Sequence, residues 1–121
     1  MSTPNQFLAV FLGSKTGARW KAWEALSEAD RKVKEQEGIA AWYTWVETHK
    51  ASISAMGGPL GKTKKVSAQG IADIVNEMGA FTVVSATSHD DAAKMFEGHP
   101  HFTIFPGERV EIMPVLPIPG M

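Results

Sequence analysis

The chain has 121 residues and no cysteine. This length predicts one domain spanning residues 1–121, and the missing cysteines exclude a disulfide scaffold, thiolate-bound zinc and a thiol nucleophile. Twelve basic and thirteen acidic side chains give a net charge of −1. Because this balance leaves no positive excess to neutralise phosphates, we expect no nucleic-acid partner.

The N-terminal residues give no sign of export or of membrane insertion. Residues 1–6 are polar and lack a basic stretch before an apolar one, so they do not resemble a signal peptide. The apolar run Phe7–Leu12 is too short to span a bilayer. These features predict a cytoplasmic protein with no membrane partner.

The first half of the chain predicts a strand followed by helices. Residues 7–12 form an apolar run that ends at Gly13, as a buried strand would. Residues 18–26 are expected to form a short helical turn. Ser27 and the acids after it are typical of a helix start, and apolar residues at three- and four-residue steps extend this helix to about Lys50. Gly38 inside it costs about 1 kcal/mol relative to alanine.

The middle of the chain alternates short strands with glycine-rich segments. Residues 53–56 are a strand candidate, and residues 57–61 form a turn cluster. Residues 62–66 are expected to form an exposed edge strand, whose lysines discourage aggregation. Residues 67–79 are expected to form a loop with a turn of helix.

The last part predicts a strand, a helix and a final strand. Residues 80–86 are rich in β-branched side chains. Ser88 begins a helix that ends at Gly98. A loop through Gly107 leads to an alternating strand at residues 109–113. The prolines after Pro114 impose an extended tail, which we expect to lie along a partner subunit or the edge of its own sheet.

This order of elements contains two βαβ-like halves. It predicts an α+β fold, a ferredoxin-like βαββαβ sandwich with both helices on one face of an antiparallel sheet. The other sheet face would then be open, and the chain is 44% hydrophobic. We therefore expect a homodimer in which two sheets pack face to face, forming a dimeric α+β barrel.

The second half also resembles a known family. Residues 57–64, Gly-Gly-Pro-Leu-Gly-Lys-Thr-Lys, resemble the Asp-Gly-Pro-Phe segment that names the DGPF group of YCII-related proteins. The resemblance is strongest over residues 81–96, and it continues through residues 100–102 and 111–114. It covers residues 50–116 well and the first strand and helix only in layout. It implies membership of the dimeric α+β barrel superfamily, and therefore a dimer.

Two departures from the family pattern bear on function. Gly57 stands where the motif has its acid, so the acid-base role of that carboxylate is absent. The His–Asp pair of YCII-like members has no clear counterpart, because no histidine precedes His49. The resemblance therefore indicates the fold more than the function.

His99-Pro100-His101 is the local feature most suggestive of chemistry. In an extended chain, residues two apart point to the same side, and two imidazoles could then shuttle a proton or hold a metal. A metal would need further ligands, and no spacing in the sequence demands them. The alternative is structural, with His99 ending a helix and His101 packing in a loop.

The glycine-rich segment suggests an anion site. Gly58, Lys62 and Lys64 could bind an anion, although the spacing is not that of a phosphate-binding loop and no helix follows. The alternative is a plain turn with solvated lysines.

The tryptophans suggest an apolar pocket. Trp20 and Trp23 could line a pocket between sheet and helix, where small-ligand sites commonly form. Trp42 and Trp45, three residues apart, share one helix face. The alternative for all four is packing in the core or at a dimer interface.

These features leave several functions open. One is a small-molecule enzyme without a bound cofactor or metal, in which His101 or His99 acts as the general acid or base. Another is a noncatalytic ligand-binding or accessory module that uses the same pocket. A third is a subunit whose main role is assembly. No complete catalytic constellation in the sequence separates them.

Overall fold

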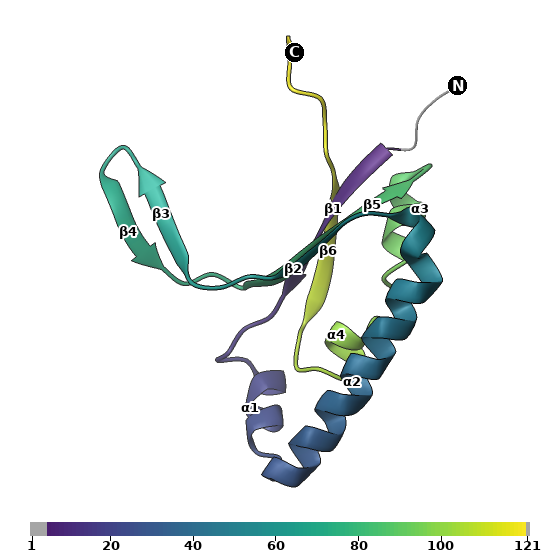
Figure 1. The fold of residues 1–121 in the computed structure, drawn as a ribbon. Coiled ribbons are helices and arrows are strands. Elements are labelled where there is room, and N and C mark those ends of the chain that lie inside the picture. Colours follow the sequence, from purple (N-terminus) through teal and green to yellow (C-terminus); the bar gives the residue numbers. More distant parts are fainter. Residues whose placement is uncertain (1–4, 121) are drawn as a thin grey trace.

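A four-stranded antiparallel sheet is the centre of the computed structural model, which describes residues 5–120 (Figure 1). Across the sheet the strands follow the order β2 (Ile53–Pro59), β5 (Met78–Ala86), β1 (Asn5–Leu12) and β6 (Arg109–Pro114). The predicted mixed α+β layout with an antiparallel sheet is confirmed. The strand order, with β1 and β5 in the middle, is that of a ferredoxin-like unit.

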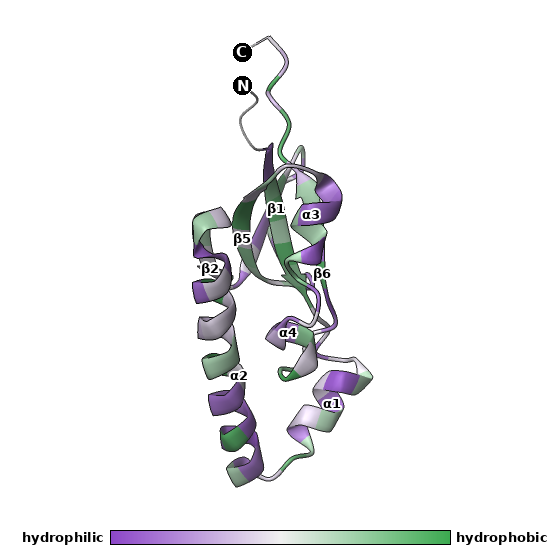
Figure 2. Cartoon of the chain, turned by 90° about the vertical axis from the view of Figure 1, so that its right-hand side faces the viewer, coloured by the Kyte–Doolittle hydropathy of each residue, from purple (hydrophilic) through white to green (hydrophobic). Residues whose placement is uncertain are grey.

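The helical elements are α1 (Ala18–Glu24), α2 (Glu28–His49), the 3₁₀ turn η1 (Lys50–Ser52), α3 (His89–Lys94) and α4 (Pro100–Thr103). Helices α2 and α3 lie on one face of the sheet, and α1 lies beyond the end of the sheet (Figures 1 and 2). Both predicted serine caps are confirmed. The Ser27 hydroxyl accepts from the backbone N–H of Asp30, and that of Ser88 accepts from Asp91, each at 3.1 Å. No helix in the described residues is long and apolar enough to cross a membrane.

The hydrophobic core lies between β1 and the helices. Phe7, Ala9 and Phe11 alternate along β1 and are all buried. They form one cluster with Trp45 of α2 and with Ala92 and Phe96 of the second helical region. The period of two in β1 and the helical spacing around Trp45 thus bring their apolar faces together.

The opposite face of the sheet carries no helix (Figure 2). Leu8 and Val10 alternate with the core residues of β1 and therefore point to this face. Their neighbours across β5 are Val83 and Phe81, and Met113 of β6 lies opposite Leu8. This face is apolar at these residues, although Glu111 of β6 lies opposite Val10, which is buried. We refer to it below as the open sheet face.

Two predictions for the middle of the chain are wrong. Residues 57–59 continue strand β2 rather than forming a turn, with an irregular register between Ala55 and Gly58. Residues 67–79 contain no helical turn. Instead β4 (Gly70–Ile74) pairs antiparallel with β3 (Thr63–Ser67) in a separate two-stranded hairpin. The helical spacing of the apolar residues there was misleading, because the structure leaves them exposed rather than packing them on one helix face.

Gly38 has a packing role that the sequence did not indicate. It is buried in the middle of α2, and a Cβ added there would lie 2.4 Å from the ring of Phe105. Only glycine allows the phenyl ring to approach the helix backbone this closely. The residue that weakens the helix locally is therefore the one that lets the segment after α4 pack against it.

The tail after β6 is extended, as predicted. The N–H of Val115 donates to the carbonyl of Gln6 at 2.9 Å. Beyond this bond, Leu116 and Ile118 are exposed, and Figure 1 shows the tail leaving the body of the protein. Its predicted contact with a partner subunit stays a prediction.

Candidate functional site

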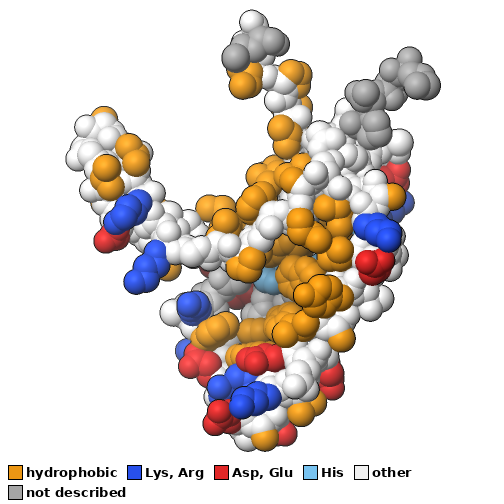
Figure 3. Space-filling view, in the orientation of Figure 1, with side chains coloured by type: hydrophobic (Ala, Val, Ile, Leu, Met, Phe, Trp, Pro, Cys, Tyr) orange, Lys and Arg blue, Asp and Glu red, His pale blue; other side chains and the backbone are white. Residues whose placement is uncertain are grey.

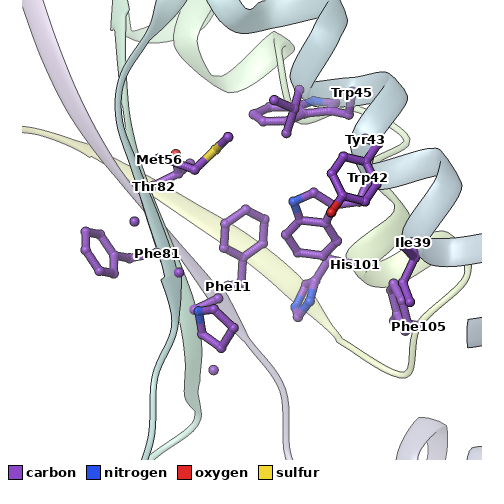
Figure 4. A pocket seen from close by; sticks show the side chains of 16 residues that line it. Phe11, Ile39, Trp42, Tyr43, Trp45, Met56, Phe81, Thr82, His101 and Phe105 are labelled. Carbon is purple, nitrogen blue, oxygen red and sulfur yellow. The ribbon is translucent and has the colours of Figure 1, made fainter.

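A pocket of about 590 Å³ lies between α2 and the sheet (Figure 4). One wall comes from α2, with Ile39, Trp42, Tyr43, Trp45 and Val46. The other wall comes from β2 and β5, and Phe11, His101 and Phe105 lie between the two walls. Figure 3 shows the corresponding hollow, in which a histidine surface is surrounded by hydrophobic side chains.

The walls of this pocket are aromatic and aliphatic. Among the described residues that line it, no side chain is Asp, Glu, Lys or Arg. Apart from the indole N–H groups of Trp42 and Trp45, the polar side chains are those of His101, Tyr43 and Thr82, and the Thr82 hydroxyl already donates to the carbonyl of Ala55 at 2.9 Å. The pocket therefore suits an uncharged, flat molecule with few polar groups.

His101 is held by the backbone of strand β1. Its Nε2 lies 2.9 Å from the carbonyl oxygen of Leu12. A carbonyl oxygen only accepts hydrogen bonds, so Nε2 carries the proton. In the neutral ring the lone pair is then on Nδ1.

The charge state of His101 follows from its surroundings. Burial lowers its pKa below the usual 6.5, and the positive charge of Arg19 acts in the same direction. Hydrogen bonding to the backbone of Leu12 and Arg109 opposes this shift without reversing it. At pH 7 the imidazole is therefore neutral and can accept a proton.

His99 has a different role from His101, although only Pro100 separates them. The prediction that this segment is extended is wrong, because helix α4 begins at Pro100. His99 is the N-cap of α4, and its Nδ1 accepts from the backbone N–H of His101 at 3.0 Å. Proline at the first helical position supplies no N–H, which suits this start.

The His99 ring is fully buried among aromatic rings. Its centroid lies 4.5 Å from that of Trp42, at 90°, and 4.8 Å from that of Trp45. Since Nδ1 accepts a hydrogen bond, the proton is on Nε2, which has no hydrogen-bond partner among the described residues. Burial, with His101 and His49 nearby, lowers the pKa of His99 to about 3. This ring is therefore a neutral part of the core.

Arg19 of α1 supports the segment that carries His101. Its Nε donates to the carbonyl of Gly107 at 2.7 Å, and its Nη2 donates to the carbonyls of Phe102 and Phe105. The His101 ring packs directly on Gly107, where an added Cβ would lie 2.2 Å from the imidazole Cε1. The hydrogen bonds donated by Arg19 and the lack of a side chain at Gly107 therefore set the position of the His101 ring.

The glycine and lysine residues of the predicted anion site are separated. Gly58 lines the pocket. Lys62 precedes β3, and Lys64 lies in β3, where its Nζ is paired with the carboxylate of Asp73 at 2.7 Å. Neither lysine lines the pocket, so the structure does not bring together the three residues on which the anion-site interpretation depends.

The predicted tryptophan residues lie beside the pocket rather than in it. Trp20 is half-buried, with Lys15 Nζ 5.7 Å from its ring centroid. The ring centroids of Trp23 and Phe105 are 6.0 Å apart, and Trp23 does not line the pocket. Trp42 and Trp45 line the pocket instead. The three-residue spacing of Trp42 and Trp45, which places both on one helix face, is the feature of the sequence that could have indicated this.

Gly57 marks where this chain departs from the Asp-Gly-Pro-Phe motif. Its φ is +64°, and an added Cβ would lie 2.0 Å from the carbonyl oxygen of Phe81. A side chain at this position would require the irregular part of β2 to change its path. Glycine therefore suits the backbone path at this position, which leaves no room for the side chain of the motif's acid.

Three supporting residues could not be identified from the sequence. Arg19 and Gly38 each act on a segment roughly 70 to 90 residues away in the chain, and Gly107 acts on His101 through the turn that follows α4. The described residues also bring together no group of three or more His, Cys, Asp or Glu side chains that could hold a metal ion.

The fold and the pocket define an α+β protein with a small-molecule-sized cavity between sheet and helix. Among solved structures, the chain is similar to 5-chloro-2-hydroxyhydroquinone dehydrochlorinase (TftG) from Burkholderia phenoliruptrix AC1100, in complex with 2,5-dihydroxybenzoquinone. The two chains are 19% identical, with a TM-score of 0.51, over 89% of this chain and 90% of the other.

At this identity the likeness shows the fold alone. The shared fold is a mixed α+β fold with an antiparallel sheet, and membership of the dimeric α+β barrel superfamily stays a prediction. No family model matches the chain, and a search of curated proteins finds no match either. Membership of the YCII-related family and the dimeric state therefore stay predictions.

Proposed function

We propose that this protein binds a flat, oxygen-bearing ring compound in the pocket between α2 and the sheet, with a hydroxyl of the ligand at His101. The observation that carries the proposal is a neutral imidazole in a pocket that is otherwise aromatic and uncharged. The volume of about 590 Å³ falls in the range of small-molecule sites. The complex of the structurally similar dehydrochlorinase with a dihydroxybenzoquinone supports a ligand of this chemistry.

His101 would act as a hydrogen-bond acceptor and general base. Its Nδ1 takes the proton of an acidic ligand hydroxyl, so that the O–H bond breaks, an N–H bond forms, and an oxyanion faces an imidazolium. The same nitrogen can return the proton to another atom of the ligand. We assign this role to His101 alone, because His99 is fully buried as a helix cap with a pKa of about 3.

A noncatalytic ligand-binding module is the second candidate. It is favoured by the lack of a second acid or base among the described pocket residues, apart from the Tyr43 hydroxyl. The two candidate functions use the same ligand site. An enzyme would convert the ligand to a product, whereas a binding module would release it unchanged.

We further propose that residues 1–121 act as one domain in a homodimer. The open sheet face, where Leu8 of β1 and its β5 neighbour Val83 are half-buried and carry no helix, supports pairing with a second copy. A cytoplasmic location and the lack of a bound cofactor or metal stay expectations from the sequence.

The test is a titration with hydroxylated benzoquinones and naphthols, followed by the fluorescence of Trp42 and Trp45. We expect saturable binding at pH 7 that weakens as the pH falls below the lowered pKa of His101, because the protonated ring cannot accept from a hydroxyl. The variant His101→Gln should lose about tenfold or more in affinity, equivalent to about 1.4 kcal/mol. Analysis of the compound after incubation separates the enzyme from the binding module.

His89→Gln is the matched control. The Nε2 of His89 also lies against a backbone carbonyl, that of Ile112 at 2.8 Å, but this residue does not line the pocket. If both variants bind the compounds as tightly as the wild type, the role of His101 is refuted.

A further inference from the structure

One hydrogen-bond donor of the pocket has no partner among the described residues. The indole nitrogen of Trp42 can only donate, and no hydrogen bond joins it to another described group, whereas the Nε1 of Trp45 donates to the carbonyl of Met95 at 2.7 Å. The unpartnered side-chain atoms that are fully buried in the described residues are the Nε of Arg31 and the Nε2 of His99. The Nε1 of Trp42 is therefore open to the pocket that this residue lines.

The packing of the Trp42 ring holds this donor in a fixed direction. The ring centroid lies 4.5 Å from that of His99, 5.1 Å from that of Phe11 and 6.2 Å from that of Phe105. Rings packed on several sides leave a large side chain few alternative rotamers. Figure 4 shows the indole nitrogen on the side of the ring that faces Phe11 and the open centre of the pocket. The N–H therefore points into the space that a ligand would occupy.

The other polar side chains of the pocket already have partners or lie in water. The hydroxyl of Thr82 and the Nε2–H of His101 both donate to backbone carbonyls. Tyr43 is 71% exposed, so water reaches its hydroxyl. Among the described side chains that line the pocket, Trp42 is therefore the one whose unpaired donor points into the interior.

An unpaired donor sets a requirement for the ligand. A ligand that displaces water from the Trp42 N–H must supply an acceptor, because a donor enclosed without one loses the hydrogen bond that it made to water. A site of this kind rejects analogues that lack the required group. Under the proposed function the ligand hydroxyl is already used at His101, so a second group must face Trp42. A carbonyl conjugated with the ligand ring is suitable, because it is planar and its oxygen only accepts hydrogen bonds.

We propose that Trp42 determines the specificity of the pocket. Its Nε1–H donates to a ring carbonyl oxygen of the ligand, so that hydroxylated ring ketones and quinones bind in preference to phenols that carry hydroxyl groups alone. The ring centroids of Trp42 and His101 are 6.4 Å apart, with an angle of 86° between the ring planes, so one small ring system can contact both side chains. The inference rests on the proposed function, because it takes the ligand hydroxyl at His101 as given.

Calorimetric titration with two matched compounds tests this specificity. The pair is 6-hydroxy-1-tetralone and 5,6,7,8-tetrahydro-2-naphthol, which have the same skeleton and the same phenolic hydroxyl and differ in one conjugated carbonyl. We expect the wild type to bind the ketone about tenfold more tightly or better. Trp42→Phe keeps an aromatic ring without the N–H and should bind the two compounds about equally. Trp45→Phe is the matched control, since the N–H that it removes is bonded to Met95, and it should keep the preference of the wild type.

A nuclear magnetic resonance measurement on the wild type does not depend on the folding of either variant. The indole N–H signal of Trp42 should move downfield when the ketone binds and not when the carbonyl-free compound binds. The inference is overturned, and the proposed function stands, if the wild type binds both compounds equally, if Trp42→Phe keeps the preference, or if bound ketone leaves that signal in place. If neither compound binds, the inference is overturned as well, and the titration with hydroxylated benzoquinones and naphthols decides the proposed function separately.

Discussion

The backbone N–H of His101 donates to Nδ1 of His99 at 3.0 Å, so one histidine caps the helix on which the other lies. This bond separates the roles of two residues that look equivalent in the sequence. His99 is closed off among Trp42, Trp45 and Phe11. His101 reaches the pocket with its Nε2 fixed by Leu12. His99 therefore positions His101 by capping the N-terminus of α4.

Replacing His99 by Asn should remove a pH dependence of stability. The pKa of His99 is about 3 in the folded protein and about 6.5 in the unfolded chain. Between these values the unfolded state binds a proton that the native state does not. Stability attributable to His99 is therefore complete above pH 6.5 and falls by up to about 1.4 kcal/mol per pH unit toward pH 3.

Urea unfolding of the wild type and of His99→Asn from pH 7.5 to 4 measures this. Asn retains an N-cap acceptor, although loss of the ring lowers stability at every pH. The difference in stability between the two proteins should shrink as the pH falls. A difference that stays constant would show that His99 does not resist protonation.

Replacing Gly107 by Ala should impair the pocket through His101. The added methyl would lie 2.3 Å from Nε2 and 2.2 Å from Cε1, so the ring must move and lose its bond to Leu12. We expect the ligand affinity of Gly107→Ala to fall as far as that of His101→Gln. Titration of both variants checks this, with normal affinity for Gly107→Ala as the contradicting outcome.

Replacing Gly38 by Ala should destabilise the protein, against the local propensity. Alanine favours the helix by about 1 kcal/mol, but its Cβ would lie 2.4 Å from the Phe105 ring. Overpacking of this kind costs roughly 1–3 kcal/mol, so we expect a net loss of up to about 2 kcal/mol in urea unfolding. Gly61→Ala is the control, because a Cβ there meets nothing within 4 Å. A stabilised Gly38→Ala would mean that Phe105 moves aside freely.

Replacing Arg19 by Ala should loosen the segment between α4 and β6. It removes donors to the carbonyls of Gly107, Phe105 and Phe102, and bonds to a charged group contribute roughly 1.5–3 kcal/mol each when buried. Because Arg19 is exposed, we expect a total loss of only about 1–2 kcal/mol, with weaker ligand binding. Arg19→Lys keeps the charge but not the planar fork. If it matches the wild type in thermal unfolding and titration, the clamp is electrostatic rather than geometric.

Deleting residues 115–121 should weaken the proposed homodimer. The described part of this tail bonds to the body through Val115 N–H and exposes Leu116 and Ile118. Sedimentation equilibrium of the full chain and the shortened chain checks this. An unchanged dimer dissociation constant would remove the tail from the interface.

The sequence by itself predicted the strands β1, β5 and β6, both serine-capped helices and the mixed α+β layout. These elements depend on neighbours in the chain, such as the alternation of Phe7, Ala9 and Phe11 or the hydroxyl of Ser27 beside Asp30. Strand β3 was predicted as an exposed edge strand over residues 62–66, but its partner β4 was missed because the apolar residues there are not packed on anything in the described chain. Where side chains are not buried, the sequence carries no regular alternation of apolar and polar residues from which a strand can be predicted.

For the site, the sequence indicated a histidine pair and a tryptophan-lined pocket between sheet and helix. It could not say that His101 alone faces the pocket, or that Trp42 and Trp45 rather than Trp20 and Trp23 line it. Those choices depend on contacts between distant segments, namely Leu12 with His101 and Gly38 with Phe105. Local sequence determines which elements form, because caps and periodicity act over a few residues. Only the tertiary structure decides which side chains meet, because that depends on how the elements pack.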